Sequence, residues 1–254
     1  MKMRARVIPC LLLDRTGFYK TTRFKTPVYL GDPINILKIF NEKSVDEIAI
    51  FDIGATPAKR GPNFEYLKDL AGECFMPLAY GGGITSVAEM KRLFQIGFEK
   101  VILNSVLVDN LGLLAEAAAV FGSQSLVACI DVKRTLFGGY EVVTASALRK
   151  TGRAPADWAR ELANRGAGEI IVNSVDQDGT LAGYDLDLIK LVTAAVPVPV
   201  IASGGARNVQ DFTDAVKQGH ASACGAGAMF VFQGRHRAVL INVPSEQELD
   251  AALG

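Results

Sequence analysis

The sequence predicts an α/β protein consisting of a single (β/α)8 barrel. Short apolar runs alternate with amphipathic segments along the chain, and its two halves follow the same plan. With 254 residues, 49% of them hydrophobic, the chain can bury a large core. Apolar runs without polar alternation are typical of parallel strands that are covered on both faces. These runs are RVIPCLL, EIAIFDI, PLAYGGG, KVILNS, SLVACIDV, EIIVNSV, VPVIASGG and ASACGAGA.

The segments between these runs have a helical period and recognisable ends. Examples are PINILKIFNEK, SVAEMKRLFQIG, DLDLIKLVTAAV and NVQDFTDAVKQG. Ser86 and Asn208 stand where N-caps are expected, and Gly97, Gly166 and Gly219 where helices should end. Strands alternating with helices over this length indicate a (β/α)8 barrel, with an open doubly wound sheet as the rival structure.

An internal repeat favours the closed barrel over the open sheet. Strand markers from Val7 to Val101 are separated by about 41, 30 and 23 residues, and those from Leu126 to Ser222 by about 44, 28 and 24. Two similar half-barrels explain this agreement. We therefore predict one domain over residues 1–254, with half-barrels at about 1–122 and 123–232 and a tail at 233–254.

Composition excludes several classes of function. Lys plus Arg and Asp plus Glu number 27 each, so no net charge attracts nucleic acid or an anionic membrane. The four scattered cysteines suggest free thiols, without disulfides or a metal site, in the cytoplasm. The first strand begins too early for a signal peptide to precede it, and no run approaches the roughly 20 apolar residues of a membrane helix. We expect a soluble protein without a cofactor, with both histidines, His220 and His236, on the surface.

The site should lie where the barrel strands end, and those ends carry carboxylates and glycines. Glycine-rich turns follow corresponding strands of the two halves, at Gly81–Gly83 and Gly204–Gly205. Backbone N–H groups in such turns can approach a phosphate, although glycines also make tight turns for structural reasons alone. Two facing turns suggest a substrate with a phosphate at each end. General acid and base catalysis falls to carboxylates, with Lys20 as a further candidate.

Three strand-end carboxylates need separate interpretation. Asp131 ends the apolar strand SLVACI, where its neighbours could adjust its pKa for proton transfer, although it could also accept a structural hydrogen bond. Asp52 ends another strand and is a candidate for substrate binding. Asp176 and Asp178, in VDQDGT, could bind substrate hydroxyls or fix their own loop, and Thr180 beside them is a further candidate for substrate binding.

Taken together, these motifs resemble the HisF family, the cyclase subunit of imidazole glycerol phosphate synthase. The resemblance extends from about Arg6 to Phe232 through RVIPCL, FDI, YGGGI, KVILNS, FGSQSLVACIDVKR, GAGEIIVNSVDQDGT, GYDLDL and PVIASGGA. It implies a half-barrel-duplicated TIM barrel that receives ammonia from a glutaminase (HisH-like) partner. In HisF proper, the ammonia converts a bisphosphorylated ribulosyl aminoimidazole carboxamide into imidazole glycerol phosphate and aminoimidazole carboxamide ribotide.

The resemblance also implies roles for individual residues. The family's loop lysine corresponds to Lys20 and its second catalytic aspartate to Asp131. Its first catalytic aspartate directly follows IPCL, a position that Leu12 occupies here. Asp14, two residues later, could substitute for that acid, from a polar loop at residues 14–31 whose make-up fits a lid. The family's phosphate-binding groups correspond to Gly82, Gly83, Asn104, Gly179, Gly205, Gly227 and Ala228.

Four charged residues each precede an apolar strand run: Arg6, Glu47, Lys100 and Glu169. By themselves they could be solubilising charges at strand starts. The resemblance implies a ring of salt bridges at the barrel floor through which ammonia enters. Two cations and two anions that compensate one another could tolerate partial burial.

IPCLL in place of IPCLD, together with the tail FVFQGRHRAVLINVP, is similar to the divergent WbuZ-type HisF-like branch, which is linked to amidation of surface-polysaccharide sugars. We expect VLIN of the tail to dock on the barrel and SEQELDAAL to form a final helix. The leading interpretation is a subunit that uses ammonia for amidination of a sugar. The HisF cyclase reaction is the alternative, and a catalytically silent barrel that activates a glutaminase is a second one.

Overall fold

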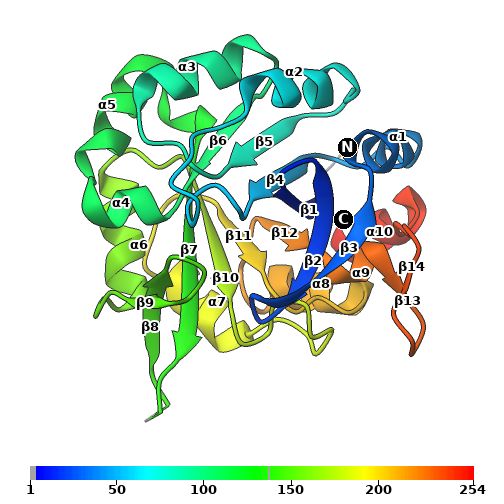
Figure 1. Cartoon of the computed structure of the whole chain (residues 1–254). Coiled ribbons are helices and arrows are strands. Elements are labelled where there is room, and N and C mark those ends of the chain that lie inside the picture. Colours follow the sequence, from blue (N-terminus) through cyan, green and yellow to red (C-terminus); the bar gives the residue numbers. More distant parts are fainter. Residues whose placement is uncertain (1–3, 137) are drawn as a thin grey trace.

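The computed structural model describes residues 4–136 and 138–254 and contains a closed parallel barrel (Figure 1). Each barrel strand pairs in parallel with the next, and the last pairs with the first through Arg6↔Ala223. Closure excludes the open doubly wound sheet and confirms the (β/α)8 barrel. In order, the strands are β1 (Arg6–Asp14), β4 (Ile48–Asp52), β5 (Leu78–Gly81), β6 (Lys100–Leu103), β7 (Leu126–Arg134), β10 (Glu169–Ser174), β11 (Val200–Ser203) and β12 (Ala223–Ala226).

Helices surround the barrel, and their ends follow the sequence signals. Ser86 accepts a hydrogen bond from the Glu89 N–H, and Asn208 forms a reciprocal capping box with Asp211. The helices are α1 (Pro33–Glu42), α2 (Phe64–Gly72), α3 (Val87–Gln95), α4 (Ser105–Asp109), α5 (Gly112–Phe121), α6 (Pro155–Asn164), α7 (Leu186–Thr193), α8 (Val209–Lys217), α9 (Ala228–Val231) and α10 (Glu246–Leu253), with a 3-10 turn η1 (Ser123–Ser125).

The apolar residues form two separate cores. The larger core lies between strands and helices and includes Leu11, Phe40, Trp158 and Phe212. The smaller core fills the inside of the barrel with compact side chains, a layered arrangement common to this fold. Its members are Ile8, Ala49, Ala79, Ile102, Val127, Cys129, Ile171, Ile201 and Ala223.

The predicted polar loop at residues 14–31 is a β-hairpin, so that part of the prediction was wrong. β2 (Gly17–Thr22) pairs antiparallel with the extended end of β1, and β3 (Lys25–Gly31) pairs with β2. β2 therefore has a strand partner on each side, whereas β3 pairs with β2 alone. The first strand of the second half, β7, is also followed by a hairpin, with β8 (Tyr140–Thr144) and β9 (Arg149–Lys150). The hairpins occupy corresponding places, while the half-barrel boundary near residue 122 stays a prediction.

The C-terminal tail covers the barrel differently from what we expected. β13 (Phe232–Gln233) and β14 (Ala238–Val239) form a small hairpin, and α10 begins with a capping box at Ser245 as predicted. Val239 and Leu240 of VLIN are 45% and 54% exposed, so they do not dock. The backbone N–H of Leu240 donates to the carbonyl of Val231 instead, and Ile241 packs on the core.

Several remaining predictions concern single side chains. His220 and His236 are exposed, as predicted. Cys10, Cys74, Cys129 and Cys224 are free thiols. None of the helices within residues 4–136 and 138–254 has the length and apolar character needed to cross a membrane.

Candidate active site

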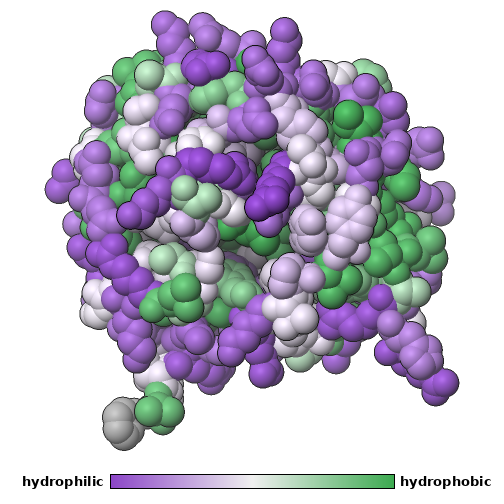
Figure 2. Space-filling model, viewed as in Figure 1, coloured by the Kyte–Doolittle hydropathy of each residue, from purple (hydrophilic) through white to green (hydrophobic). Residues whose placement is uncertain are grey.

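A cavity of about 610 Å³ opens at the C-terminal ends of the barrel strands. Figure 2, in the view of Figure 1, shows a hollow near the centre with hydrophobic groups inside it and hydrophilic residues around its rim. All eight barrel strands or the turns that follow them contribute to the wall. Of the predicted site residues, the cavity is lined by Lys20, Asp52, Gly82, Gly83, Asn104, Asp131, Asp178, Gly179, Gly204, Gly205, Gly227 and Ala228.

Asp131 lies on β7, buried between two amide side chains. Asn104 Nδ2 donates to its Oδ2 at 2.7 Å, and Asn173 Nδ2 donates to its Oδ1 at 2.9 Å. Burial raises the pKa of Asp131 to about 6, against the opposing effect of these two hydrogen bonds. A carboxyl group with that pKa can give up and take back a proton near neutral pH. The Asn104 side chain, for which the resemblance implies phosphate binding, thus donates a hydrogen bond to Asp131.

No second acid faces Asp131 from β1. Leu12 lines the cavity where the resemblance implies an aspartate. Asp14 does not line it: β1 continues as a strand and turns into β2 beyond the rim, carrying Asp14 to the backbone of Gly54. Asp14 thus lies outside the cavity wall, and its substitution for the missing acid stays a prediction.

Lys20 joins the first hairpin to the opposite side of the mouth. Its Nζ lies 2.8 Å from Asp178 Oδ1, and the side chain is only 5% exposed. The Arg23 N–H donates to the Asp178 carbonyl at 2.8 Å, and the Lys20 stem passes beside Gly227. Lys20, Asp178 and Gly227 are thereby brought together from three separate segments. Thr180 is not part of the cavity wall: its Oγ1 donates to the Gln177 carbonyl and fixes the loop, so a contact with substrate stays a prediction.

The two glycine turns need glycine for steric reasons. Gly82 has φ +133°, and a Cβ there would lie 2.5 Å from the Asp52 carbonyl oxygen. Gly204 has φ +90°, and a Cβ there would lie 2.5 Å from the Ser174 carbonyl oxygen. Both turns line the cavity and lead toward α3 and α8. This geometry suits anion binding by backbone groups at two places on the wall.

Asp52 is occupied by contacts within the protein. Its carboxylate accepts hydrogen bonds from the N–H groups of Gly54 and Ala55 and from both terminal nitrogens of Arg60, the latter at 2.7 and 2.8 Å. It therefore holds the loop after β4 in place, a structural role that our sequence interpretation had not assigned. Arg60 and its neighbour Lys59 line the cavity and add positive charge that we had not predicted.

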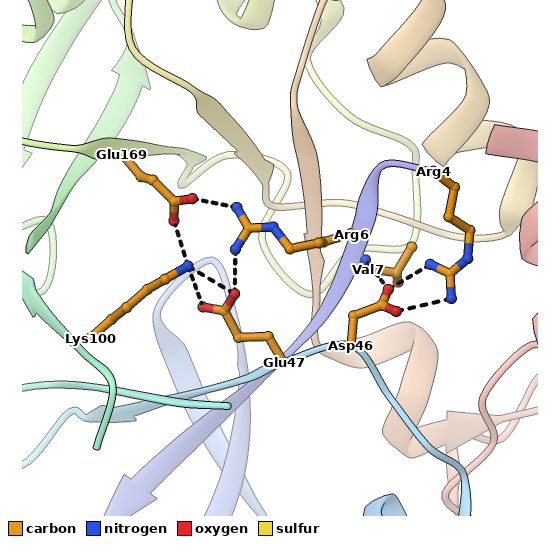
Figure 3. A network of polar contacts seen from close by, with 7 residues as sticks. All are labelled: Arg4, Arg6, Val7, Asp46, Glu47, Lys100 and Glu169. Carbon is orange, nitrogen blue, oxygen red and sulfur yellow. Dashed lines mark hydrogen bonds and ion pairs between the residues drawn. The ribbon is translucent and has the colours of Figure 1, made fainter. Parts of the chain in front are cut away.

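At the opposite end of the barrel, four charged side chains form a closed ring (Figure 3). Arg6 pairs with both Glu47 and Glu169, and Lys100 Nζ lies 3.0 Å from Glu47 and 2.9 Å from Glu169. Each cation contacts both anions, so the charges compensate one another. Glu47 is 5% exposed and Lys100 is 16% exposed, which places the ring largely out of solvent.

The barrel interior connects this ring to the cavity. On β10, Glu169, Ile171 and Asn173 occupy alternate positions and face inward. On β6, Lys100 and Ile102 also occupy alternate positions and face inward, and Asn104 follows just after the strand. The side chains between the ring and the polar layer around Asp131 are those of the small inner core. Among the described residues, no group of three His, Cys, Asp or Glu is arranged to hold a metal ion.

Comparison with known proteins agrees with this architecture. Residues 6–236 match the family described as histidine biosynthesis protein. The chain is 46% identical, over 98% of its length and 99% of the relative's, to "Putative imidazole glycerol phosphate synthase subunit hisF2" of Pseudomonas aeruginosa. It is 42% identical, over 89% of both chains, to the imidazole glycerol phosphate synthase subunit HisF of Alkaliphilus metalliredigens. The chain therefore belongs to the histidine biosynthesis protein family, as one of its HisF-like members.

Proposed function

We propose that this chain is the ammonia-using synthase subunit of a glutaminase complex and that it acts on a phosphorylated substrate. The observation that supports this proposal is the order of layers along the barrel axis. A compensated charge ring at the N-terminal ends of the strands is followed by an apolar interior and then by Asp131 in a cavity with two glycine turns. A glutaminase (HisH-like) subunit would dock at the ring, and both proteins would be cytoplasmic.

In this proposal each layer has a chemical task. Displacement of one ion pair in the ring lets ammonia enter, and uncharged ammonia crosses the apolar interior at a much lower cost than ammonium because it leaves no charge unpaired. Gly82, Gly83, Gly204 and Gly205 hold the substrate phosphates, with Lys20 and Gly227 at the mouth. Asp131 accepts a proton from the nitrogen as it attacks the substrate, which its pKa of about 6 permits.

Leu12 is the residue that bears on the choice between the candidate reactions. Loss of one of two acid and base groups costs roughly 10²- to 10⁴-fold in rate, so imidazole ring closure should be slow. We therefore propose amidination of a surface-polysaccharide sugar, in which ammonia attacks an activated carbon of the substrate, Asp131 takes a proton from the nitrogen, and the group that activates the carbon leaves with the bonding electrons. The HisF cyclase reaction is the second candidate because of the two glycine turns and the name of the Alkaliphilus relative. A silent, glutaminase-activating barrel is the third.

One pair of assays separates these three. Purified protein and the variant Leu12→Asp are given the bisphosphorylated ribulosyl substrate and an ammonium salt, and imidazole glycerol phosphate is measured. We expect no efficient turnover by the natural chain and a gain after the substitution, since the cavity would then have both carboxylates. Efficient turnover by the natural chain would rule out the sugar proposal. Absence of turnover by both proteins, and with nucleotide sugars, would favour the silent barrel.

The partner is tested separately. Co-expression with a HisH-type glutaminase should give a stable complex, and charge reversal in Lys100→Glu or Glu169→Lys should weaken it. Asp157→Lys serves as a control, because Asp157 is exposed on α6 and pairs with Arg160 of the same helix. A glutaminase that neither binds nor becomes more active would remove the basis for ammonia delivery.

A further inference from the structure

Asn173 has a buried oxygen that the protein does not use. Its Nδ2 donates to Asp131 Oδ1 at 2.9 Å, and this bond fixes the amide orientation because an ionised carboxylate can only accept hydrogen bonds. The Oδ1 atom therefore points away from Asp131. It is buried and is the one such side-chain atom within the described residues that has no hydrogen-bond partner. A buried carbonyl oxygen without a donor costs free energy, so it calls for a ligand.

The oxygen lies next to the cavity wall, covered by the turn at Gly204. Asn173 Oδ1 lies 2.9 Å from the point that a Cβ on Gly204 would occupy, so any side chain at position 204 would press on it. Asn173, Gly204 and Asp131 all line the cavity, whereas Oδ1 itself is buried. A small ligand therefore reaches Oδ1 and Asp131 together once the Asn173 side chain or the Gly204 turn shifts slightly.

Asn173 also stands directly above the apolar interior. It follows Glu169 and Ile171 on one face of β10, so its Cα lies about 13 Å along the strand from that of Glu169, at a rise of about 3.3 Å per residue. Ile171 belongs to the inner core, and Asp131 stands above Cys129 of that core in the same way. A molecule that leaves the interior therefore meets Asn173 and Asp131 as its first polar groups on these two strands.

We propose that Asn173 Oδ1 accepts an N–H of the incoming ammonia and thereby positions it beside Asp131. This inference rests on the proposed function and names a residue for it. Ammonia has three N–H groups and one lone pair. One N–H donates to Asn173 Oδ1 and another to the Asp131 carboxylate, which leaves the lone pair free to face the substrate. Asn104 gives Asp131 a similar bond but leaves no buried acceptor unpaired, which makes it the matched comparison.

Nuclear magnetic resonance on the full chain tests this binding without turnover. Protein carrying ¹³C-labelled aspartate and ¹⁵N-labelled asparagine side chains is titrated with ammonium chloride near the pKa of ammonium. Tetramethylammonium chloride, which has no N–H, controls for salt. A second titration well below that pKa controls for the ammonium ion. We expect saturable shifts of the Asn173 and Asp131 signals only where neutral ammonia is present.

Two substitutions assign the effect. Asn173→Leu should abolish the Asp131 response to ammonia, whereas Asn104→Leu should keep it, and cooperative unfolding shows that both variants are folded. Equal responses to the two salts, or an unchanged Asp131 response in Asn173→Leu, would overturn the proposal. If Asn173→Leu does not fold, Asn173→Asp provides the second variant. It keeps an acceptor but loses the bond to Asp131, so the response should persist.

Kinetics distinguish a failure of this inference from a failure of the proposed function. Once a substrate is turned over with ammonium salts, Asn173→Leu should raise the KM for ammonia by about 2- to 10-fold, the range expected for loss of one hydrogen bond. The KM for the phosphorylated substrate should change little. An enzyme that is active but shows equal ammonia KM values in both proteins refutes the role of Asn173 alone. An enzyme that lacks ammonia-dependent activity, yet shows the resonance shifts, refutes the proposed function alone.

Discussion

The burial of Asp131 predicts a specific pH dependence of stability, which the isosteric variant Asp131→Asn isolates. The pKa of this carboxyl rises from 3.8 to about 6 in the folded protein, chiefly because burial disfavours its charged form. An acid with a raised pKa binds its proton more tightly in the folded state than in the unfolded state. Stability from this group is therefore lost as pH rises from about 4 to about 6.

The magnitude follows from the two pKa values. A rise of about two units corresponds to roughly 3 kcal/mol of free energy of unfolding. The amide that replaces the carboxyl group in Asp131→Asn cannot ionise, so the variant should gain about that much relative to the natural chain between pH 4 and pH 7. Effects of the substitution that do not depend on pH, such as an amide facing the donors from Asn104 and Asn173, cancel when the stability difference between the two proteins at pH 7 is compared with that at pH 4.

Urea denaturation of both proteins across this pH range measures the difference. A control is Asp109→Asn, since a hydrogen bond from Arg149 lowers the pKa of this exposed carboxyl. Its contribution to stability is lost only as pH falls below about 4, so the effect of this substitution should stay nearly constant between about pH 5 and pH 7. Direct ¹³C titration of Asp131 should give a midpoint near 6. A stability difference that does not change with pH, or a midpoint near 4, would refute the conclusion that burial prevails over the two amide hydrogen bonds.

Three further predictions concern other parts of the molecule. Lys100→Met leaves Glu47 and Glu169 with Arg6 alone and should cost about 3 kcal/mol of unfolding free energy in urea titrations, part of which Glu47→Gln should restore. Gly204→Ala should weaken phosphate binding in calorimetry and cost at least about 1 kcal/mol, because φ is +90° and the Cβ would clash, whereas Gly72→Ala in α2 meets nothing within 4 Å and should leave binding unchanged. Phe75 is 88% exposed at the charge-ring end, and its backbone N–H is held by the Asn41 side chain. Phe75→Asp should weaken glutaminase binding by about 2 kcal/mol, while Leu148→Asp, equally exposed but at the cavity end, should not.

The sequence was informative where a local pattern has one structural outcome. Uninterrupted β-branched runs predicted the barrel strands, because parallel strands buried on both faces admit few polar residues. Charges placed immediately before four of these runs face the barrel axis and meet as a ring. Glycines in the strand-to-helix turns were located correctly as well, because their positive φ angles and close backbone approach exclude other residues.

Predictions were less successful where an outcome depends on partners far along the chain. GFYKTT was interpreted as a loop, although its pairing with the end of β1 makes it a strand. The role of Asp52 could not be deduced, because Arg60 reaches it from an irregular loop. Asn173 was missed altogether. The available signal was the alternation along β10: Glu169, Ile171 and Asn173 are two residues apart in turn, so they face the same side, into the barrel.

The layers of the barrel give a structural form to two requirements that the sequence already distinguished through Leu12 and the four charges. In the proposed function, delivery of ammonia needs the ring and an apolar interior, and the chain has both. The resemblance implies that ring closure needs two acid and base groups, whereas Leu12 stands in place of one and Asp14 does not line the cavity. Asp131 is left with two amide partners, and burial raises its pKa to about 6 against the opposing effect of their hydrogen bonds. A lone base so tuned suits addition of ammonia to an activated carbon better than a cyclisation that must both protonate and deprotonate its substrate. Leu12→Asp therefore tests the chemistry and leaves the delivery route unchanged.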